Sequence, residues 1–466
     1  MINGSLSTVI YPVNTLPAEI LCKIFAFAVS SSLGNDITRT LLLITSVCQR
    51  WRQVAIADPR LWTNVGYFVR RFDRNEPDWL LRHFLSRALG HPIRLALSFA
   101  AAYSRVNVLP HHFFSSARQW MEADITGPSN EGWAFHPSDL PLASALDLPH
   151  LEKLSLDVRI HVGVPPRPMF QNAPRLRELS IRQPLHILQL SFPVYQLRKL
   201  TILHGSNTAA CSHIISVLPK LIALEDLTLP SLIDDMSHES PTPFPMHRLE
   251  TLALFGCSSI VLPHLSMPSV TSLQLSELST YIALRSLDSL PGIVSVSLVG
   301  SRPSTFGVVL NTAMFTPVKH LTVDAFPMAP PNATQCATDL GTLLPNLESF
   351  TVRIPPSMTS ASSRSVLRPF IDGIVMRANI ARAAGVTAMK LTHFIADFAP
   401  LTVQPVLFPE DTRDLKHLQQ TTNIQISMPN GYPARKRWRL QAGNSNEEHT
   451  EELIQEVNSK NPLVIG

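Results

Sequence analysis

The sequence predicts an α/β protein in which a small all-helical module precedes a long array of strand-containing repeats. From residue 151 onward, an apolar triplet with one internal spacing recurs at nearly constant intervals. The chain also has 39 Pro and only 18 Gly, which favours many short, sharply ended segments. Its 466 residues exceed one ordinary domain, and a repeat array accommodates such a length.

The helical module is predicted at residues 14–66. Pro17 stands at a first helical position, where the missing N–H costs nothing, and Glu19 faces the positive end of the helix dipole. A second apolar stripe, from Ile44 to Ala55, keeps helical spacing and ends at Asp58-Pro59. Helices this short bury too little surface to be stable alone, so we expect a partner or a neighbouring domain to cover them.

Three separated blocks of this module stand in a fixed order: Leu16-Pro17-x-Glu19-Ile20-Leu21-x-x-Ile24-Phe25, Val47-Cys48-x-x-Trp51-Arg52-x-x-Ala55 and Pro59-x-Leu61-Trp62. Together they resemble an F-box, most closely the F-box that accompanies leucine-rich repeats in fungal proteins. The resemblance implies docking on a Skp-type adaptor and, through it, on a cullin–RING ubiquitin ligase. The contact residues that it implies are Leu16, Pro17, Ile20, Leu21, Ile24, Leu61 and Trp62.

The same resemblance implies that Cys48 and Trp51 pack internally. The stretch from Ser30 to Thr40 departs from the family because it is longer and more polar than the usual connection. A plainer interpretation is that the module only caps the array, although its Leu-Pro start and Leu-Trp end are expected to be partly exposed in so small a unit.

The array is predicted from nine triplets of the form apolar, two variable, apolar, one variable, apolar. Their first positions are 21 to 29 residues apart, and the pattern resembles leucine-rich repeats. The triplets are Leu151-Leu154-Leu156, Leu176-Leu179-Ile181, Leu197-Leu200-Ile202, Leu224-Leu227-Leu229, Leu249-Leu252-Leu254, Val270-Leu273-Leu275, Ile293-Val296-Leu298, Val318-Leu321-Val323 and Leu347-Phe350-Val352. The apolar positions should point inward from parallel strands, with helices or irregular segments on the convex side of an irregular solenoid.

Further strands are predicted at Ile93-Leu95-Leu97, Trp120-Ala123-Ile125, Val386-Met389-Leu391 and around Ile424 and Ile426. Helical patterns fall at 211–218, 281–287, 335–344, 365–383 and 414–420. The predicted organisation is an extension at 1–13, the module at 14–66, a helical linker and first strand at 67–116, the solenoid at 117–428, and a partly disordered tail at 429–466.

The variable positions of the strands should form the concave face of the solenoid. This face is charged at its ends and small or apolar at its centre, where Phe255 stands out, as in a protein interface with a polar rim. The candidate substrate-binding residues are Arg182, Lys199, Phe255, Gln274, His320 and Arg353. Equally, the protein's own C-terminus or N-terminal module could cover the face.

Composition argues against other classes of function. A net charge of +4 is too weak to indicate nucleic acid, and no apolar run has the length of a membrane span. Five cysteines without paired spacing are typical of reduced thiols in the cytoplasm or nucleus. We find no catalytic, metal-ligating or cofactor-binding pattern. The sequence therefore predicts a substrate receptor of a Skp–cullin–F-box ligase, or else a non-catalytic scaffold that acts outside a ligase.

Overall fold

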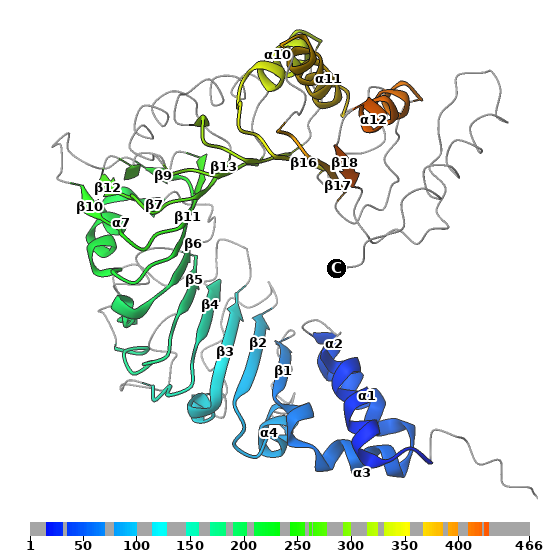
Figure 1. Ribbon diagram of the computed structural model, residues 1–466. Helices are drawn as coiled ribbons and strands as arrows, with labels where there is room; N and C mark the ends of the chain where they lie inside the picture. The colour runs from blue at the N-terminus through cyan, green and yellow to red at the C-terminus, as the bar shows by residue number, and fades with distance from the viewer. Residues whose placement is uncertain are drawn as a thin grey trace, which may run out of the picture. The chain divides into compact units, whose positions relative to one another are not determined.

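In the computed structural model the chain forms two compact units, residues 1–239 and 240–466, each containing a parallel β-sheet (Figure 1). The described residues are 15–30, 35–69, 79–99, 114–127, 146–157, 168–182, 190–202, 209–233, 243–256, 261–262, 264–276, 292–299, 315–324, 330–354, 367–384, 390–398, 409–421 and 424–427. Within them, no helix is long and apolar enough to cross a membrane.

The first unit begins with three helices, α1 (Ala18–Ser30), α2 (Asn35–Val47) and α3 (Gln49–Ala57), and the 3-10 turn η2 (Pro59–Trp62). The carbonyl oxygen of Pro17 accepts from the amides of Ile20 and Leu21 at 3.1 Å and so begins α1, as predicted. The expected single second helix is wrong: it is broken at Cys48, whose sulfur accepts the amide of Trp51 at 3.4 Å and caps α3. Because α2 begins at Asn35, much of the expected polar connection is helical.

The sheet of the first unit has the order β1-β2-β3-β4-β5-β6-β8, with all neighbours parallel. Its strands are β1 (Asn64–Val69), β2 (Ile93–Phe99), β3 (Trp120–Thr126), β4 (Lys153–Asp157), β5 (Glu178–Ile181), β6 (Lys199–Ile202) and β8 (Asp226–Leu229). The connections contain α4 (Trp79–Arg87), α7 (Cys211–Val217), η3 (Ala117–Gln119), η5 (Val194–Gln196) and η6 (Leu218–Lys220). A separate two-stranded pair joins β7 (Ala209–Ala210) and β9 (Leu232–Ile233).

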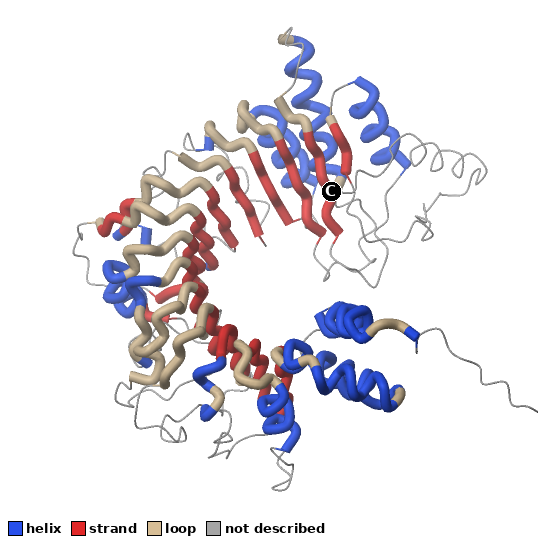
Figure 2. Tube along the Cα trace, turned by 60° about the horizontal axis from the view of Figure 1, so that its bottom comes forward, coloured by secondary structure: helices blue, strands red, loops and turns tan. Residues whose placement is uncertain are grey.

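The second unit has a parallel sheet of order β11-β13-β14-β15-β16-β17-β18. Its strands are β11 (Thr251–Phe255), β13 (Ser272–Ser276), β14 (Ser295–Val299), β15 (His320–Asp324), β16 (Ser349–Ile354), β17 (His393–Phe398) and β18 (Gln425–Ser427), and a separate pair joins β10 (Phe244–Pro245) and β12 (Leu265–Ser266). Helices α10 (Pro330–Thr342), α11 (Arg368–Ala383) and α12 (Pro409–Thr421) lie together on one face of its last strands (Figure 2).

The predicted triplets form a recurring part of the core in both units. All nine lie on or just before a parallel strand, and each of their 27 side chains is at most 3% exposed. Equivalent positions pair across strands, as Leu154 does with Leu179 and Leu252 with Leu273. The predicted periodicity of buried strands is therefore confirmed.

One predicted triplet, Val386-Met389-Leu391, is wrong. Strand β17 begins at His393 and Phe394 pairs with Phe350, so Leu391 occupies the first position of its triplet instead of the last. The other predicted strands, and the helices at α7, α10, α11 and α12, are present. The predicted helix at 281–287, the extension at 1–13 and the tail at 429–466 lie outside the described residues.

Candidate functional site

Helix α1 has two apolar faces, and only one of them is covered. Leu21, Phe25 and Val29 follow one another at four-residue intervals and are at most 2% exposed. On the other side, Ile20, Ile24 and Phe27 are 40%, 44% and 75% exposed. The buried face contacts α3, where the ring centroid of Phe25 lies 4.9 Å from that of Trp51. The second face is available to a partner.

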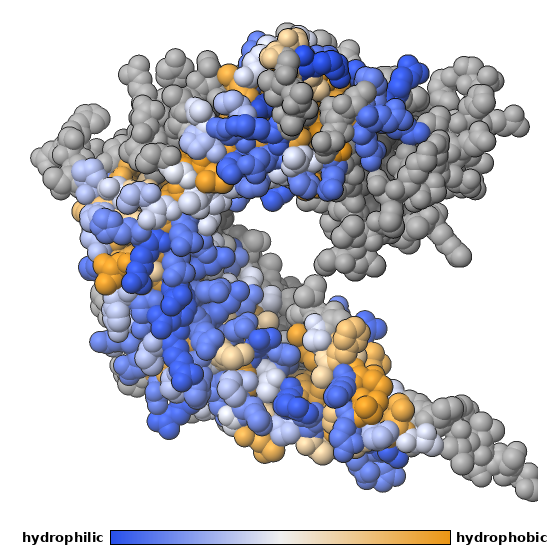
Figure 3. Space-filling view, in the orientation of Figure 1, coloured by the Kyte–Doolittle hydropathy of each residue, from blue (hydrophilic) through white to orange (hydrophobic). Residues whose placement is uncertain are grey.

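Exposed apolar side chains continue onto the next two helices, and Figure 3 shows apolar surface gathered over α1 and α2. We call the set the apolar strip. It comprises Ile20, Ile24, Phe27, Leu42, Leu43, Val47 and Ile56. Leu43 and Val47 are 58% and 59% exposed and lie one helical turn apart. Single exposed apolar residues are ordinary, but a group of seven on three consecutive short helices is typical of a protein interaction site.

The apolar strip overlaps only in part with the predicted contact residues. Ile20, Ile24 and Pro17 are exposed as expected. Leu16 is half-buried, and its carbonyl oxygen accepts from the guanidinium of Arg50 at 2.6 Å. Phe27, Leu42, Leu43, Val47 and Ile56 were missed. Helical spacing from Ile20 and Ile24 could have indicated Phe27, whereas the exposure of Leu42 and Leu43 depends on which face of α2 packs.

The expected partial exposure of the Leu61-Trp62 end is wrong, because these side chains are 2% and 1% exposed. Leu21, another predicted contact, is also buried, at 0% exposed. The indole nitrogen of Trp62 donates to the carbonyl oxygen of Ala55 at 2.8 Å.

The ring of Trp62 also lies edge-on to Phe84 of α4, with centroids 5.0 Å apart, and the guanidinium carbon of Arg87 lies 4.3 Å above it. Burial lowers the pKa of Arg87, and burial together with Arg87 lowers the pKa of His83. Trp62 therefore joins the helical module to α4.

A polar cluster closes the same end of the module. Asp58 is 7% exposed and accepts from the amide of Arg60 at 3.1 Å and from its guanidinium at 2.8 and 2.9 Å. These bonds hold the pKa of Asp58 below its usual range. Burial and the Asp58 carboxylate raise the pKa of the Cys22 thiol. The thiol is therefore protonated at neutral pH, and the cluster is structural rather than nucleophilic.

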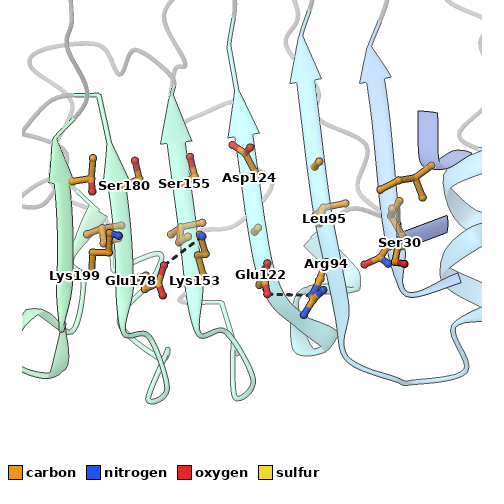
Figure 4. A pocket seen from close by; sticks show the side chains of 18 of the residues that line it. Ser30, Arg94, Leu95, Glu122, Asp124, Lys153, Ser155, Glu178, Ser180 and Lys199 are labelled. Carbon is orange, nitrogen blue, oxygen red and sulfur yellow. Dashed lines mark ion pairs between the residues drawn. The ribbon is translucent and has the colours of Figure 1, made fainter. Parts of the chain in front are cut away.

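A second feature is a groove of about 580 Å³ on the first unit (Figure 4). Its floor is the face of β1 to β6 that carries the variable residues, which we call the open face, and Val29, Ser30 and Ile37 of the helical module line one end. Its charged lining residues are three basic and three acidic, namely Arg94, Lys153 and Lys199 with Glu122, Asp124 and Glu178.

The strand register places most of these charges in a single row. From β2 to β8 the aligned residues are Arg94, Glu122, Lys153, Glu178, Lys199 and Asp226, so the sign alternates at every strand. We call this row the charge ladder. Ion pairs join Arg94 to Glu122 at 3.1 Å and Lys153 to Glu178 at 3.4 Å. A neighbouring aligned row holds small polar residues, Asp124, Ser155, Ser180, Thr201 and Thr228.

The open face of the second unit is different in character. Its corresponding row contains no Asp, Glu, Lys or Arg, and consists of Thr251, Ser272, Ser295, His320, Ser349 and His393. Phe255 and Gln274 are half-buried, and His320 and Arg353 are exposed.

All six predicted substrate-binding residues thus reach an open face, with Arg182 and Lys199 on the first unit and the other four on the second. Arg182 is paired with Asp157. The sequence prediction missed Arg94 and Glu122, which align with Lys153 only once the register is known. In the described residues, no cluster of ligating side chains could hold a metal ion.

Comparison with known proteins finds a similarity in the helical module. An F-box-like family model matches residues 13–67, the segment that contains α1, α2, α3 and η2. No curated protein matches the chain.

Proposed function

We propose that this protein is the substrate-recognition adaptor of a Skp–cullin–F-box ubiquitin ligase. The apolar strip carries the proposal, because it lies inside the segment that the F-box-like model matches and is uncovered in the structure. F-box domains typically bind Skp-type adaptors. An exposed face of large aliphatic and aromatic side chains on short helices is suited to packing against an apolar groove of such a partner.

The strip also supports specific residue roles. Ile20, Ile24 and Phe27 recur at helical spacing on α1, and Phe27 is the most exposed of the seven side chains. Burying a large apolar side chain contributes about 1.5–3 kcal/mol. We therefore assign the central contacts to Ile24 and Phe27, with Pro17, Leu43 and Val47 around them. The buried Leu21, Leu61 and Trp62 are assigned a packing role in the core of the helical module.

The remainder of the chain is proposed to be an irregular leucine-rich-repeat solenoid that holds a protein substrate. The recurring buried triplets on parallel strands support this assignment. Substrate would lie on the open faces, and the six predicted residues Arg182, Lys199, Phe255, Gln274, His320 and Arg353 remain the proposed contacts. The protein itself is an adaptor without catalytic residues, in the cytoplasm or nucleus. It acts by raising the effective concentration of substrate beside a loaded conjugating enzyme.

The test is a binding titration of the full chain with a purified Skp-type adaptor. The double variant Ile24→Asp/Phe27→Asp should weaken binding by at least about thirtyfold, since each change places a charge in an apolar interface. Ile222→Asp is the matched control, because Ile222 is equally apolar and 72% exposed but lies outside the module. Failure of the folded wild-type chain to bind would leave a repeat scaffold that acts outside a ligase.

A further inference from the structure

We propose that the groove on the first unit binds a helical segment of the substrate that carries acidic and basic side chains in alternation, and that this recognition does not depend on phosphorylation. The inference rests on the proposed function in that the bound segment belongs to the ligase substrate. It concerns the open face of β2 to β8, beside the helical module.

The first argument is the order of the charge ladder. Six residues on six strands alternate in sign without interruption, and all six lie in one register row. The two internal ion pairs are 40–56% exposed. Exposed pairs contribute little to stability, about 0–1 kcal/mol each. The alternating charges of the ladder are exposed on the floor of the groove. They are complementary to a partner whose charges alternate with the opposite sign at each position.

The second argument is spacing. Neighbouring strands lie about 4.8 Å apart, so charges of one sign recur about every 10 Å along the ladder. Side chains on one face of an α-helix recur about every 5.4 Å, and residues seven apart lie about 10.5 Å apart. An extended chain places same-face side chains about 6.8 Å apart, which is about 2 Å more than the distance between strands. Its side chains therefore no longer face the ladder residues after about three strands. A helix laid across the strands matches the ladder; an extended peptide does not.

The third argument is the balance of charge. A phosphate group carries about −1.5 to −2 charges at neutral pH and is bound by a surplus of cations. The groove has no surplus, because its three basic residues face three acidic ones. Arg94 and Lys153 are already paired with carboxylates. A phosphorylated segment would meet as much repulsion as attraction here.

Lys199, the last ladder residue that lines the groove, supplies the best single contact. Lys199 is exposed and, among the residues that the structure describes, has no carboxylate within ion-pairing distance. Thr201 lies on the same face of β6, two residues further along. An acidic side chain of the bound helix would pair with Lys199 without displacing an existing ion pair.

The probe is a synthetic alanine-based helical peptide with Glu, Lys, Glu, Lys and Glu at successive three- and four-residue intervals. Its binding to the full chain, in complex with the Skp-type adaptor, is measured by fluorescence anisotropy at low salt. A second peptide has the same composition with the charges segregated into an acidic and a basic half. A third carries phosphothreonine in place of the central Glu. The alternating peptide should bind at least about tenfold more tightly than the other two.

The double variant Lys153→Glu/Glu178→Lys keeps an internal ion pair but reverses the middle of the ladder, so it should remove that preference. The exchange Arg198→Glu/Glu225→Arg is the matched control, because this pair is also 3.4 Å long and similarly exposed but lies outside the groove. It should leave binding unchanged.

Tighter binding of the phosphopeptide would overturn the inference, as would equal binding of all three peptides by a chain that still binds the Skp-type adaptor. In either case the proposed function would stand. A different result is that the chain alone prefers the alternating peptide but does not bind the Skp-type adaptor at all. The groove would then be established and the ligase role would fail.

Discussion

The ring of Trp62 packs edge-on against the ring of Phe84, with centroids 5.0 Å apart. One residue ends the helical module and the other belongs to α4, so the two elements share a core. A module of three short helices buries little surface by itself, and here part of the missing core comes from the next element of the chain. The residues of the apolar strip, on α1, α2 and α3, remain exposed.

Replacing Trp62 should destabilise the first unit strongly. Trp62→Ala removes a fully buried ring and is expected to cost about 3–5 kcal/mol of unfolding free energy, measured by urea denaturation followed by circular dichroism. Trp62→Phe keeps the ring contact but leaves the carbonyl oxygen of Ala55 without the indole donor, so a cost of about 1–3 kcal/mol is expected. Equal stability of Trp62→Ala and wild type would contradict the shared core.

The contribution of Asp58 should depend on pH. Its pKa is lowered in the folded state, first by the hydrogen bond from Arg60. The stabilisation is therefore fully present above the unfolded-state pKa of about 4 and is lost as the pH falls through the lower folded value. Asp58→Asn should cost about 1–3 kcal/mol at pH 7, and the difference from wild type should shrink below pH 4. A difference that stays constant from pH 7 to pH 2.5 would refute this account.

The sequence predicts the strands of this protein better than its surfaces. The strands of the nine tandem triplets are present because burial on one side of a parallel strand is a local, periodic property, as at Leu154 and Leu252. The charge ladder is not local. Arg94 and Lys153 are 59 residues apart in the sequence and become part of one row only through the register of β2, β3 and β4.

The candidate docking site shows the same limit. Ile24 and Trp62 both belong to the F-box-like blocks, yet one is 44% exposed and the other 1%. The difference arises because α4, which lies beyond the module, covers Trp62. Likewise, the break between α2 and α3 depends on the capping sulfur of Cys48, which helical periodicity alone does not reveal.

Arg377 should be important for the stability of the second unit although it is not among the predicted contact residues. Its side chain is 9% exposed, and its guanidinium donates to the carbonyl oxygens of Leu340, Leu343 and Leu344 at the C-terminal end of α10. Burial lowers its pKa. Arg377→Met leaves these acceptors without their donor and should cost about 2–4 kcal/mol. Arg382→Met, at an exposed position on the same helix, should change stability by less than about 0.5 kcal/mol.

Two glycines at the crossing of α10 and α11 should differ in how much alanine destabilises the protein. A Cβ on Gly373 would lie 2.9 Å from two side-chain carbons of Leu340 and 3.1 Å from the carbonyl oxygen of Ala337. The backbone oxygen cannot move without shifting α10, so Gly373→Ala should cost about 1–3 kcal/mol.

At Gly341 the three atoms nearest to the new Cβ all belong to the side chain of Met376: its sulfur at 2.8 Å, its Cγ at 2.9 Å and its Cβ at 3.1 Å. Met376 is 38% exposed and can change rotamer. The higher helix propensity of alanine, worth up to about 1 kcal/mol, then offsets most of the strain, so Gly341→Ala should stay within about 1 kcal/mol of wild type. Thermal unfolding of both variants measures the contrast. If Gly341→Ala proved the more damaging of the two, the close approach at Gly373 could not be what sets the distance between these helices.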